Sequence, residues 1–395
     1  GERTHRRELV GPLHLDLERA PTALDHEGRV VGLESDLGGE ALPQDAQQLG
    51  GRHQDVCLAL ELVEQVHETL ARHRADDRRR GWISGLGEEE GRRHPTVGGL
   101  RIGKPLPERD PVEPFDERLE WERDGQYFHY LTRWMHALVR VSLAAGEPRF
   151  LEWAFELARS AHDAFTYSPG EGFARRMVWK MSIDLSRPLV ASMGHHDPLD
   201  GALTFAELGS RRPARDTASA RRIGGRPGLE REIADMLAMC VGVDWRTTDP
   251  LGLGGLLNDA LRLCELITRE EWPATSLLEP ILHGCLGGLT SLGSGEFLSR
   301  PASGRLAFRE LGLSIGLKAI PRLVDVSHEG FGRSGALRRA SPLVEALAGY
   351  VPLARRIEES WQIPTNRGTA AWREHEDINA VMLAASLVPD GLLGC

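Results

Sequence analysis

The chain of 395 residues carries a formal net charge of −10 at pH 7, with 41% hydrophobic and 27% charged residues and a mean hydropathy of −0.31. This composition is typical of a globular protein with a large core, and it excludes a disordered or fibrous chain. The acidic balance argues against nucleic acid or an anionic membrane as a partner, because such binding is driven largely by Lys and Arg.

Membrane and secretion signals are missing from the sequence as given. No apolar run reaches the roughly 18 residues of a membrane-spanning helix, and the apolar run near 381–388 is of core size. Residues 1–7 lead into no apolar stretch, so we expect a secretory signal to be absent or already removed. The five cysteines form no CxxC pair, which predicts free thiols and a cytoplasmic location.

Aromatic residues divide the chain near residue 95. Residues 1–95 contain no Phe or Tyr and one Trp, whereas all ten Phe, all four Tyr and eight of the nine Trp follow. Aromatic side chains supply much of the buried area of a core. We therefore expect an atypical, weakly folded N-terminal region over 1–95, with one helix over 55–72, and a helical toroid domain over 96–395.

The helical pattern after residue 95 begins with a hairpin. Residues 126–144 carry apolar side chains on one broad face, Gly146-Glu-Pro interrupts the pattern, and residues 150–165 repeat it. Further helices are predicted at about 200–209, 228–241, 252–268, 274–292, 304–325, 340–358 and 369–388. No alternating pattern of useful length predicts a strand. The expected fold class is all-α.

Three of the predicted helices share a pattern of small residues, at 251–257, 282–289 and 311–317. Glycine costs about 1 kcal/mol per site in a helix interior. Its repeated use therefore predicts close helix-to-helix approach, as the inner helices of a ring require.

The first segment that could contribute to a functional site runs from Gly99 to Tyr130, and in it charged residues alternate with aromatic residues. Carboxylates beside aromatic rings suit a sugar, whose apolar face stacks on a ring while its hydroxyls form hydrogen bonds. The candidates are Asp124 for catalysis and Arg101, Lys104, Trp121 and Tyr127 for substrate binding. Asp124 could equally cap the helix that follows. The stripe His129, Arg133, His136 and Arg140 fits a solvated face as well as a pore lining.

The second segment, 175–201, concentrates His, Lys, Arg and Asp around one Trp. A His beside a carboxylate can act as a general acid or base, because its pKa of roughly 6.5 lies near working pH. The candidates are Asp184, His196 and Asp197 for catalysis and Trp179, Lys180, Arg187 and His195 for substrate binding. Helix caps and turns are the alternative. A metal site is disfavoured, since the vicinal histidines point in different directions.

The third segment, 364–383, combines Trp372 and Arg373, expected to bind substrate, with His375, Glu376 and Asp377, expected to act in catalysis. Its acidic residues precede an apolar run, which predicts an inner helix whose N-terminal end lies at the site. The remaining group, Cys264, His283 and Cys285, favours buried thiols over zinc, because a His-x-Cys pair on a helix diverges. We expect neither a metal nor a cofactor.

Residues 96–390 resemble a group of uncharacterised bacterial proteins predicted to have the six-hairpin glycosidase-like (α/α)6 fold. The resemblance rests on GLRIGKPLPER, EWERDGQYFHYLTRWMHAL, RMVWKMSIDLSRPLV, GHHDPLDG, DPLGLGGLL, RLAFRELGLSIGL and WREHEDINAVMLAASL. More distantly, the chain is similar to the N-acylglucosamine 2-epimerase group and to toroidal glycosidases. The resemblance implies a toroid with a site at its mouth, incomplete at the N-terminus because 1–95 lacks the expected hairpins.

The expected function is that of a carbohydrate-active enzyme, a glycoside hydrolase or a sugar epimerase. Hydrolysis needs two carboxyl groups, drawn from Asp124, Asp184, Asp197, Glu376 and Asp377. Epimerisation needs a base on each face of the sugar, and His196 with His375 is the expected pair. The alternative is a non-catalytic helical toroid that binds a ligand or protein at the same mouth. We expect a small-molecule or oligosaccharide substrate, and the oligomeric state stays open.

Overall fold

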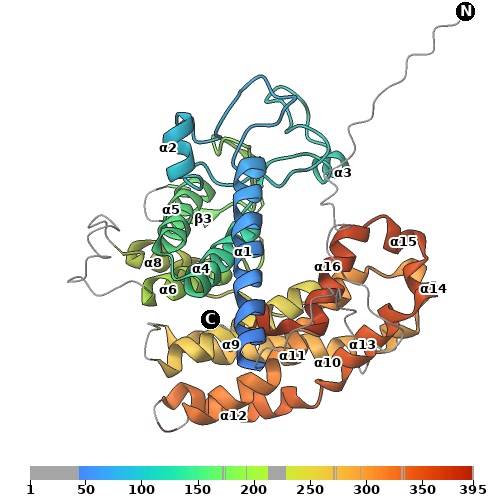
Figure 1. The fold of residues 1–395 in the computed structure, drawn as a ribbon. Coiled ribbons are helices and arrows are strands. Elements are labelled where there is room, and N and C mark those ends of the chain that lie inside the picture. Colours follow the sequence, from blue (N-terminus) through green and yellow to red (C-terminus); the bar gives the residue numbers. More distant parts are fainter. Residues whose placement is uncertain are drawn as a thin grey trace, which may run out of the picture.

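The computed structural model describes residues 44–393, apart from 171–172, 174, 193, 212–227, 270–271, 273, 294, 331 and 333, with side chains from residue 55 onward. The described part is mostly helical, which confirms the expected all-α class (Figure 1). Residues 1–43, nearly half of the predicted N-terminal region, lie outside it.

The helices follow one another in pairs. The longer ones are α1 (Gln44–Leu70), α4 (Phe128–Ala145), α5 (Pro148–Phe165), α6 (Asp197–Ser210), α8 (Glu230–Met239), α9 (Pro250–Thr268), α10 (Leu278–Leu292), α11 (Ala307–Glu329), α12 (Gly335–Ala348), α13 (Pro352–Gln362) and α16 (Glu376–Leu387). The single-turn helices are α2 (Glu88–Arg93), α3 (Glu117–Glu120), α14 (Pro364–Arg367) and α15 (Ala370–Arg373), with 3₁₀ turns at Thr275–Leu277, Glu296–Ser299, Ala302–Gly304 and Pro389–Gly391.

The predicted helices are present with shifted ends, and two of them are split. The helix expected over 340–358 breaks between α12 and α13, where Pro352 starts a new helix. The helix expected over 369–388 divides into α15 and α16. Local signals set the starts: Asp249 caps α9 by accepting the N–H of Gly252 (2.9 Å), and Pro250 takes the first helical position.

Short strands, which the sequence pattern did not predict, connect α4, α5 and α6. They are β1 (Gln126–Tyr127), β2 (Thr166–Tyr167), β3 (Arg176–Met177), β4 (Lys180–Met181) and β5 (Pro188–Val190), paired antiparallel as β1-β4-β5 and β2-β3. Strands of two or three residues are too short to show alternation. The β1–β4 pair holds Lys180–Met181 against the start of α4, and the β2–β3 pair holds Arg176–Met177 against the end of α5.

Five helices, α4, α6, α9, α11 and α16, pack side by side in parallel. Contacts between their first turns join Thr132 to Asp200, His196 to Gly252, Asp249 to Arg309 and Phe308 to Asn379. Further along, His136 and Glu207 line one crevice, and contacts join Glu207 to Arg262, Glu265 to Arg322 and Lys318 to Ser386. The first turns of these helices contact one another, and their later turns contact one another. The five helices therefore run in the same direction, with all their N-terminal ends at one end. We call this end the rim.

The other long helices after α4 carry the chain back toward the rim. α5 packs on α4, α8 on α6, α10 on α9, and α12 and α13 on α11. Figure 1 shows the green helices α4, α5, α6 and α8 together and the yellow to red helices α9 to α16 continuing the array. The repeated unit is therefore a helical hairpin, as predicted for 126–165 and extended here to the later helices.

Glycines set the distance between α9 and α11. A Cβ added at Gly254 would lie 2.1 Å from the carbonyl oxygen of Gly312, and one added at Gly316 would lie 2.3 Å from that of Gly254. The predicted close approach is thus found for two of the three glycine segments. The third segment, on α10, belongs to a returning helix, where Gly284 makes room for Trp245.

Residues before the expected boundary at residue 95 pack against residues after it. Trp82 is buried, Thr96 donates to the carbonyl of Trp153 (2.8 Å), and His67 accepts from the indole of Trp134 (3.0 Å). Arg74 reaches Asp124 beyond the expected boundary (3.4 Å). The described end of the N-terminal region therefore shares the core of the following domain, which its few aromatic residues did not indicate.

Candidate functional site

The rim carries a cluster of aromatic rings at the start of α4. The Trp179 ring lies 5.3 Å from Trp121 and 5.0 Å from Tyr127, measured between ring centroids. Trp121 is half exposed, whereas Tyr127 is buried and its hydroxyl has no hydrogen-bond partner among the described residues. The Trp179 indole donates to the hydroxyl of Ser192 (3.0 Å), which connects these rings to the segment that enters α6. The exposed face of Trp121 offers a stacking surface.

Two histidines stand at the entrance to α6. The rings of His195 and His196 lie 4.6 Å apart, and the buried Trp245 lies 6.0 Å from His196. Burial, with a contribution from His195, lowers the pKa of His196 to about 4. Its Nε2 atom is buried and has no partner among the described residues. His196 is therefore neutral near pH 7.

Asp197 is the first residue of α6, directly after His196. Its Oδ2 atom is buried without a partner in the described chain, and a Cβ added at Gly194 would lie 2.0 Å from this oxygen. Burial and the neighbouring charge of Asp200 raise the pKa of Asp197 to about 7. The helix dipole acts in the opposite direction, but its effect of about 1 kcal/mol is less than one pKa unit. Asp197 is thus about half protonated at pH 7, whereas an ordinary aspartate is ionised there.

Beneath Asp197 lies a buried network centred on Arg262 of α9. The guanidinium group contacts Asp200 (2.7 Å), Glu207 (2.7 Å) and Asp259 (3.1 Å), and Arg133 approaches Asp200 from the surface (3.6 Å). Burial and the charge of Asp200 raise the pKa of Asp259 to about 7. With Asp197 and Asp259 protonated, two carboxylates face two guanidinium groups, so the network is balanced when both acids are neutral.

This network predicts a pH dependence of stability. The folded-state pKa of Asp259 is raised, so the folded protein keeps a proton that the unfolded chain loses, and stability from this group falls as pH rises from about 4 to 7. In Asp259→Asn this loss is absent, because the amide does not titrate. Between pH 5 and pH 8, we expect the free energy of unfolding of Asp259→Asn to fall by about 2 kcal/mol less than that of the wild type.

Urea unfolding of both proteins at the two pH values measures this change. The control is Asp244→Asn, because the ion pair with Arg246 holds the pKa of exposed Asp244 at about 2, outside the window. Parallel pH profiles for wild type and Asp259→Asn would contradict the protonated state of Asp259.

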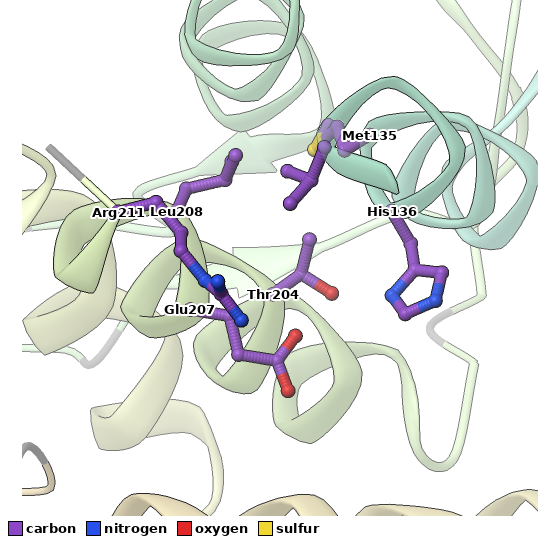
Figure 2. Close-up of a pocket in the computed structure, with 7 residues that line it drawn as sticks. Met135, His136, Thr204, Glu207, Leu208 and Arg211 are labelled. Carbon is purple, nitrogen blue, oxygen red and sulfur yellow. The ribbon is translucent and has the colours of Figure 1, made fainter. Parts of the chain in front are cut away.

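A small crevice lies between α4 and α6, next to this network. Figure 2 shows Thr204 and Glu207 of α6, with Arg211 directly after its end, opposite Met135 and His136 of α4. Its accessible volume of about 10 Å³ holds roughly one water molecule. The crevice is therefore too small for a sugar, and the solvent-facing rim is the better candidate site.

Asp124 does not lie at this site. It is fully buried, with Oδ2 accepting from Arg101 (3.0 Å) and Oδ1 accepting from the N–H of Gly103 (2.9 Å). Arg101 also donates to the carbonyl of Thr69 (2.8 Å), and the carbonyl of Lys104 accepts from Arg74. The expected catalytic role of Asp124 and binding role of Arg101 are corrected to structural ones, because both side chains are used in joining the N-terminal segment to the loop before α4.

The charged residues of β4 and of the loop from β4 to β5 also have structural partners. Lys180 is fully buried against Glu120 (2.9 Å), so it cannot bind a substrate as expected. Asp184 accepts from Ser182 (2.8 Å) and pairs with Arg79 (2.9 Å). Arg187 donates to the carbonyl of Arg109. These three residues hold a loop whose strand pairing the sequence pattern did not show.

The third predicted segment divides between core and rim. Trp372 is buried with its ring 5.7 Å from Trp361, so its expected binding role is corrected to packing, and Arg373 donates to the carbonyl of Gly368 (2.6 Å). His375 lies at the start of α16, 5.5 Å from Phe308. Glu376 and Asp377 follow in the exposed first turn of α16, at the rim.

Several rim residues were missed from the sequence. Tyr130 lies 5.3 Å from Tyr127, Asp249 pairs with Arg309, and Trp245 packs beside His196. The signal available for Asp249 was its position before Pro250. For the network beneath the rim, the signal was charged residues inside the otherwise apolar helices 200–209 and 252–268.

Comparison of the chain with protein-family models, with curated proteins and with solved structures finds no match. Among the helices that the structure describes, none combines the length and apolarity needed to cross a membrane. The described residues contain no group of three or more His, Cys, Asp or Glu side chains arranged to hold a metal ion. The function is therefore inferred from the rim itself.

Proposed function

We propose that the protein is a carbohydrate-active enzyme, a glycoside hydrolase or sugar epimerase, with its active site at the rim. The observation that carries the proposal is the pair His196 and Asp197, adjacent in the chain, in which a neutral imidazole is followed by a carboxyl group whose raised pKa of about 7 leaves it partly protonated at pH 7. A carboxyl group with a pKa near working pH is suited to donate a proton, and the neighbouring imidazole stays unprotonated there. The half-exposed Trp121 adds the stacking surface that a sugar ring prefers.

The five parallel helices support a toroidal interpretation. In the proposed (α/α)6 toroid, α4, α6, α9, α11 and α16 form the inner wall and α5, α8, α10, α12 and α13 the outer one. The resemblance to six-hairpin glycosidase-like proteins and the shared position of five N-terminal ends support this arrangement. The described chain supplies five inner helices, so the proposed ring is incomplete at its N-terminal side.

Asp197 and its neighbours have distinct roles in the two proposed reactions. In hydrolysis, Asp197 donates its proton to the leaving oxygen, and Asp249, the next carboxylate along the rim, activates water. In epimerisation, neutral His196 removes a proton from one face of the sugar, and His375 on α16 is the proposed partner on the other face. Asp200 and Arg262 act indirectly, by setting the charge around Asp197.

Asp197→Asn tests the catalytic proposal. The amide cannot donate a proton, so we expect kcat for hydrolysis of the best glycoside to fall at least about 100-fold. In the wild type, kcat should fall as pH rises above about 7, because the acid must be protonated. Aryl glycosides assayed by absorbance and free sugars assayed by NMR for stereochemical change identify the substrate and the reaction.

Asp163→Asn is the control, because Asp163 is an exposed carboxylate on α5, a returning helix. Its activity should stay within twofold of wild type. If Asp197→Asn retains full activity, the assigned acid is wrong. If wild type binds sugars in calorimetry but turns none over, the alternative of a non-catalytic sugar-binding toroid replaces the enzyme.

A further inference from the structure

A glycine at the rim lies directly against the proposed acid. Gly194 stands three residues before Asp197, in the segment that enters α6. A Cβ added at Gly194 would lie 2.0 Å from Oδ2, 2.5 Å from Cγ and 3.0 Å from Oδ1 of Asp197. These are its three nearest atoms apart from the adjacent residues of the chain. The carboxyl group of Asp197 therefore occupies the place that a side chain at position 194 would take.

The direction of the Asp197 side chain follows from its position in the helix. Asp197 is the first residue of α6, and the Cα–Cβ bonds of a helix tilt toward its N-terminus. A side chain at the first position therefore points back over the preceding loop. Its Oδ2 atom is buried and accepts no hydrogen bond from the described residues. This oxygen thus lies against the loop without the N–H contacts that keep many carboxylates charged at a helix start.

The available space, and not the backbone conformation, requires glycine at position 194. The φ angle of Gly194 is not positive, so its conformation does not call for glycine. The atoms that a Cβ would meet first belong to the end of one side chain, which can rotate aside. Gly254 differs, because its Cβ would meet backbone. Alanine at position 194 should therefore be tolerated and should displace the carboxyl group of Asp197.

The environment of Asp197 shows what this displacement would change. Burial is the largest cause of its raised pKa. The charges that act on it belong to three helices: Asp200 of α6, Asp259 of α9 and Arg133 of α4. The two carboxyl groups raise its pKa and the guanidinium group lowers it. None of these three side chains is among the nearest atoms of a Cβ at Gly194, so alanine there acts through the position of the Asp197 carboxyl group.

We propose that Gly194 is a positioning residue for the proposed acid: its lack of a side chain leaves the space in which the carboxyl group of Asp197 is shielded from water. Alanine moves the carboxyl group out of this space, and water or the first N–H groups of α6 then stabilise its charge. The acid consequently loses its proton at a lower pH. This role deepens the proposed function, and its effect on activity rests on that function.

The pKa of Asp197 in the full chain tests the proposal, measured by NMR of protein labelled at the aspartate carboxyl carbons. The resonance of Asp197 is assigned by its absence in Asp197→Asn. In Gly194→Ala we expect this pKa to fall by at least about one pKa unit toward the ordinary value of about 4. The thermal midpoint should stay within about 3 °C of wild type. In the hydrolase assay, the pH above which kcat falls should decrease by the same interval.

Gly209→Ala is the matched control, because Gly209 lies on the same helix and a Cβ there meets nothing within 4 Å. It should leave the pKa of Asp197 unchanged, and an equal fall in this control overturns the proposal. An unchanged pKa or a lost fold in Gly194→Ala also overturns it, since only a shielded carboxyl group should move. An ordinary pKa of about 4 in the wild type has the same consequence.

The NMR measurement requires no substrate, so it separates this role from the proposed function. If the wild type turns over no sugar while the pKa of Asp197 falls in Gly194→Ala, the proposed function is wrong and the positioning role stands. If Asp197→Asn is inactive while Gly194→Ala keeps the wild-type pKa, Asp197 remains the acid and the positioning role is wrong.

Discussion

Replacing Arg262 with methionine is expected to lower the free energy of unfolding by about 3–5 kcal/mol. Arg262 is 3% exposed and holds Asp200 and Glu207, two carboxylates that are themselves buried. Methionine fills much of the volume but leaves these charges without their main partner. The cost arises from the unpaired charges more than from the lost attraction. Urea unfolding at pH 7 measures it.

Two comparisons separate this effect from the loss of any arginine. Arg246→Met removes an arginine whose side chain is 72% exposed, and it should change stability by less than about 0.5 kcal/mol. Adding Glu207→Gln to Arg262→Met should recover part of the loss, because one buried charge is removed. A loss below about 1 kcal/mol in Arg262→Met would show that water or a neighbouring cation already compensates the carboxylates.

Replacing Gly254 with alanine is expected to destabilise the protein by about 3 kcal/mol. The added methyl group would meet the backbone of Gly312 on α11 at 2.1 Å, and backbone cannot move aside as a side chain can. The two helices must separate, which opens gaps along the remaining contacts of α9 and α11. Thermal unfolding and urea unfolding both report the change.

Gly255 provides a control on the same helix. A Cβ added there meets nothing within 4 Å, so Gly255→Ala should stabilise the protein by about 1 kcal/mol through helix propensity alone. Opposite signs at neighbouring positions identify helix contact as the cause. If both variants are stabilised, α9 and α11 do not approach as closely as the structure shows.

The same parallel arrangement connects stability and the proposed activity. Gly254 lets α9 approach α11, and this contact also sets the position of Asp249 beside Arg309 at the rim. Arg262 of α9 in turn fixes Asp200, whose charge contributes to the raised pKa of Asp197. Variants that separate the helices are therefore expected to change the pH profile of activity as well as stability.

The sequence by itself determined the all-α class, the hairpin over 126–165 and most helix positions. These features depend on short-range signals: apolar spacing and Gly146 between two helices. Such signals act within a few residues, so no knowledge of the distant chain is needed. The glycine-rich segments also predicted close approach, although not which helix each one approaches.

Only the tertiary structure decided which polar residues face solvent at one end and which pair inside. Asp124, Lys180 and Asp197 look alike in the sequence, as charged residues near aromatic rings. Their partners differ: Asp124 meets Arg101, Lys180 meets Glu120, and the buried oxygen of Asp197 meets none of the described residues. Whether a charge is neutralised depends on residues that folding brings together from distant positions, and local sequence contains no measure of that distance.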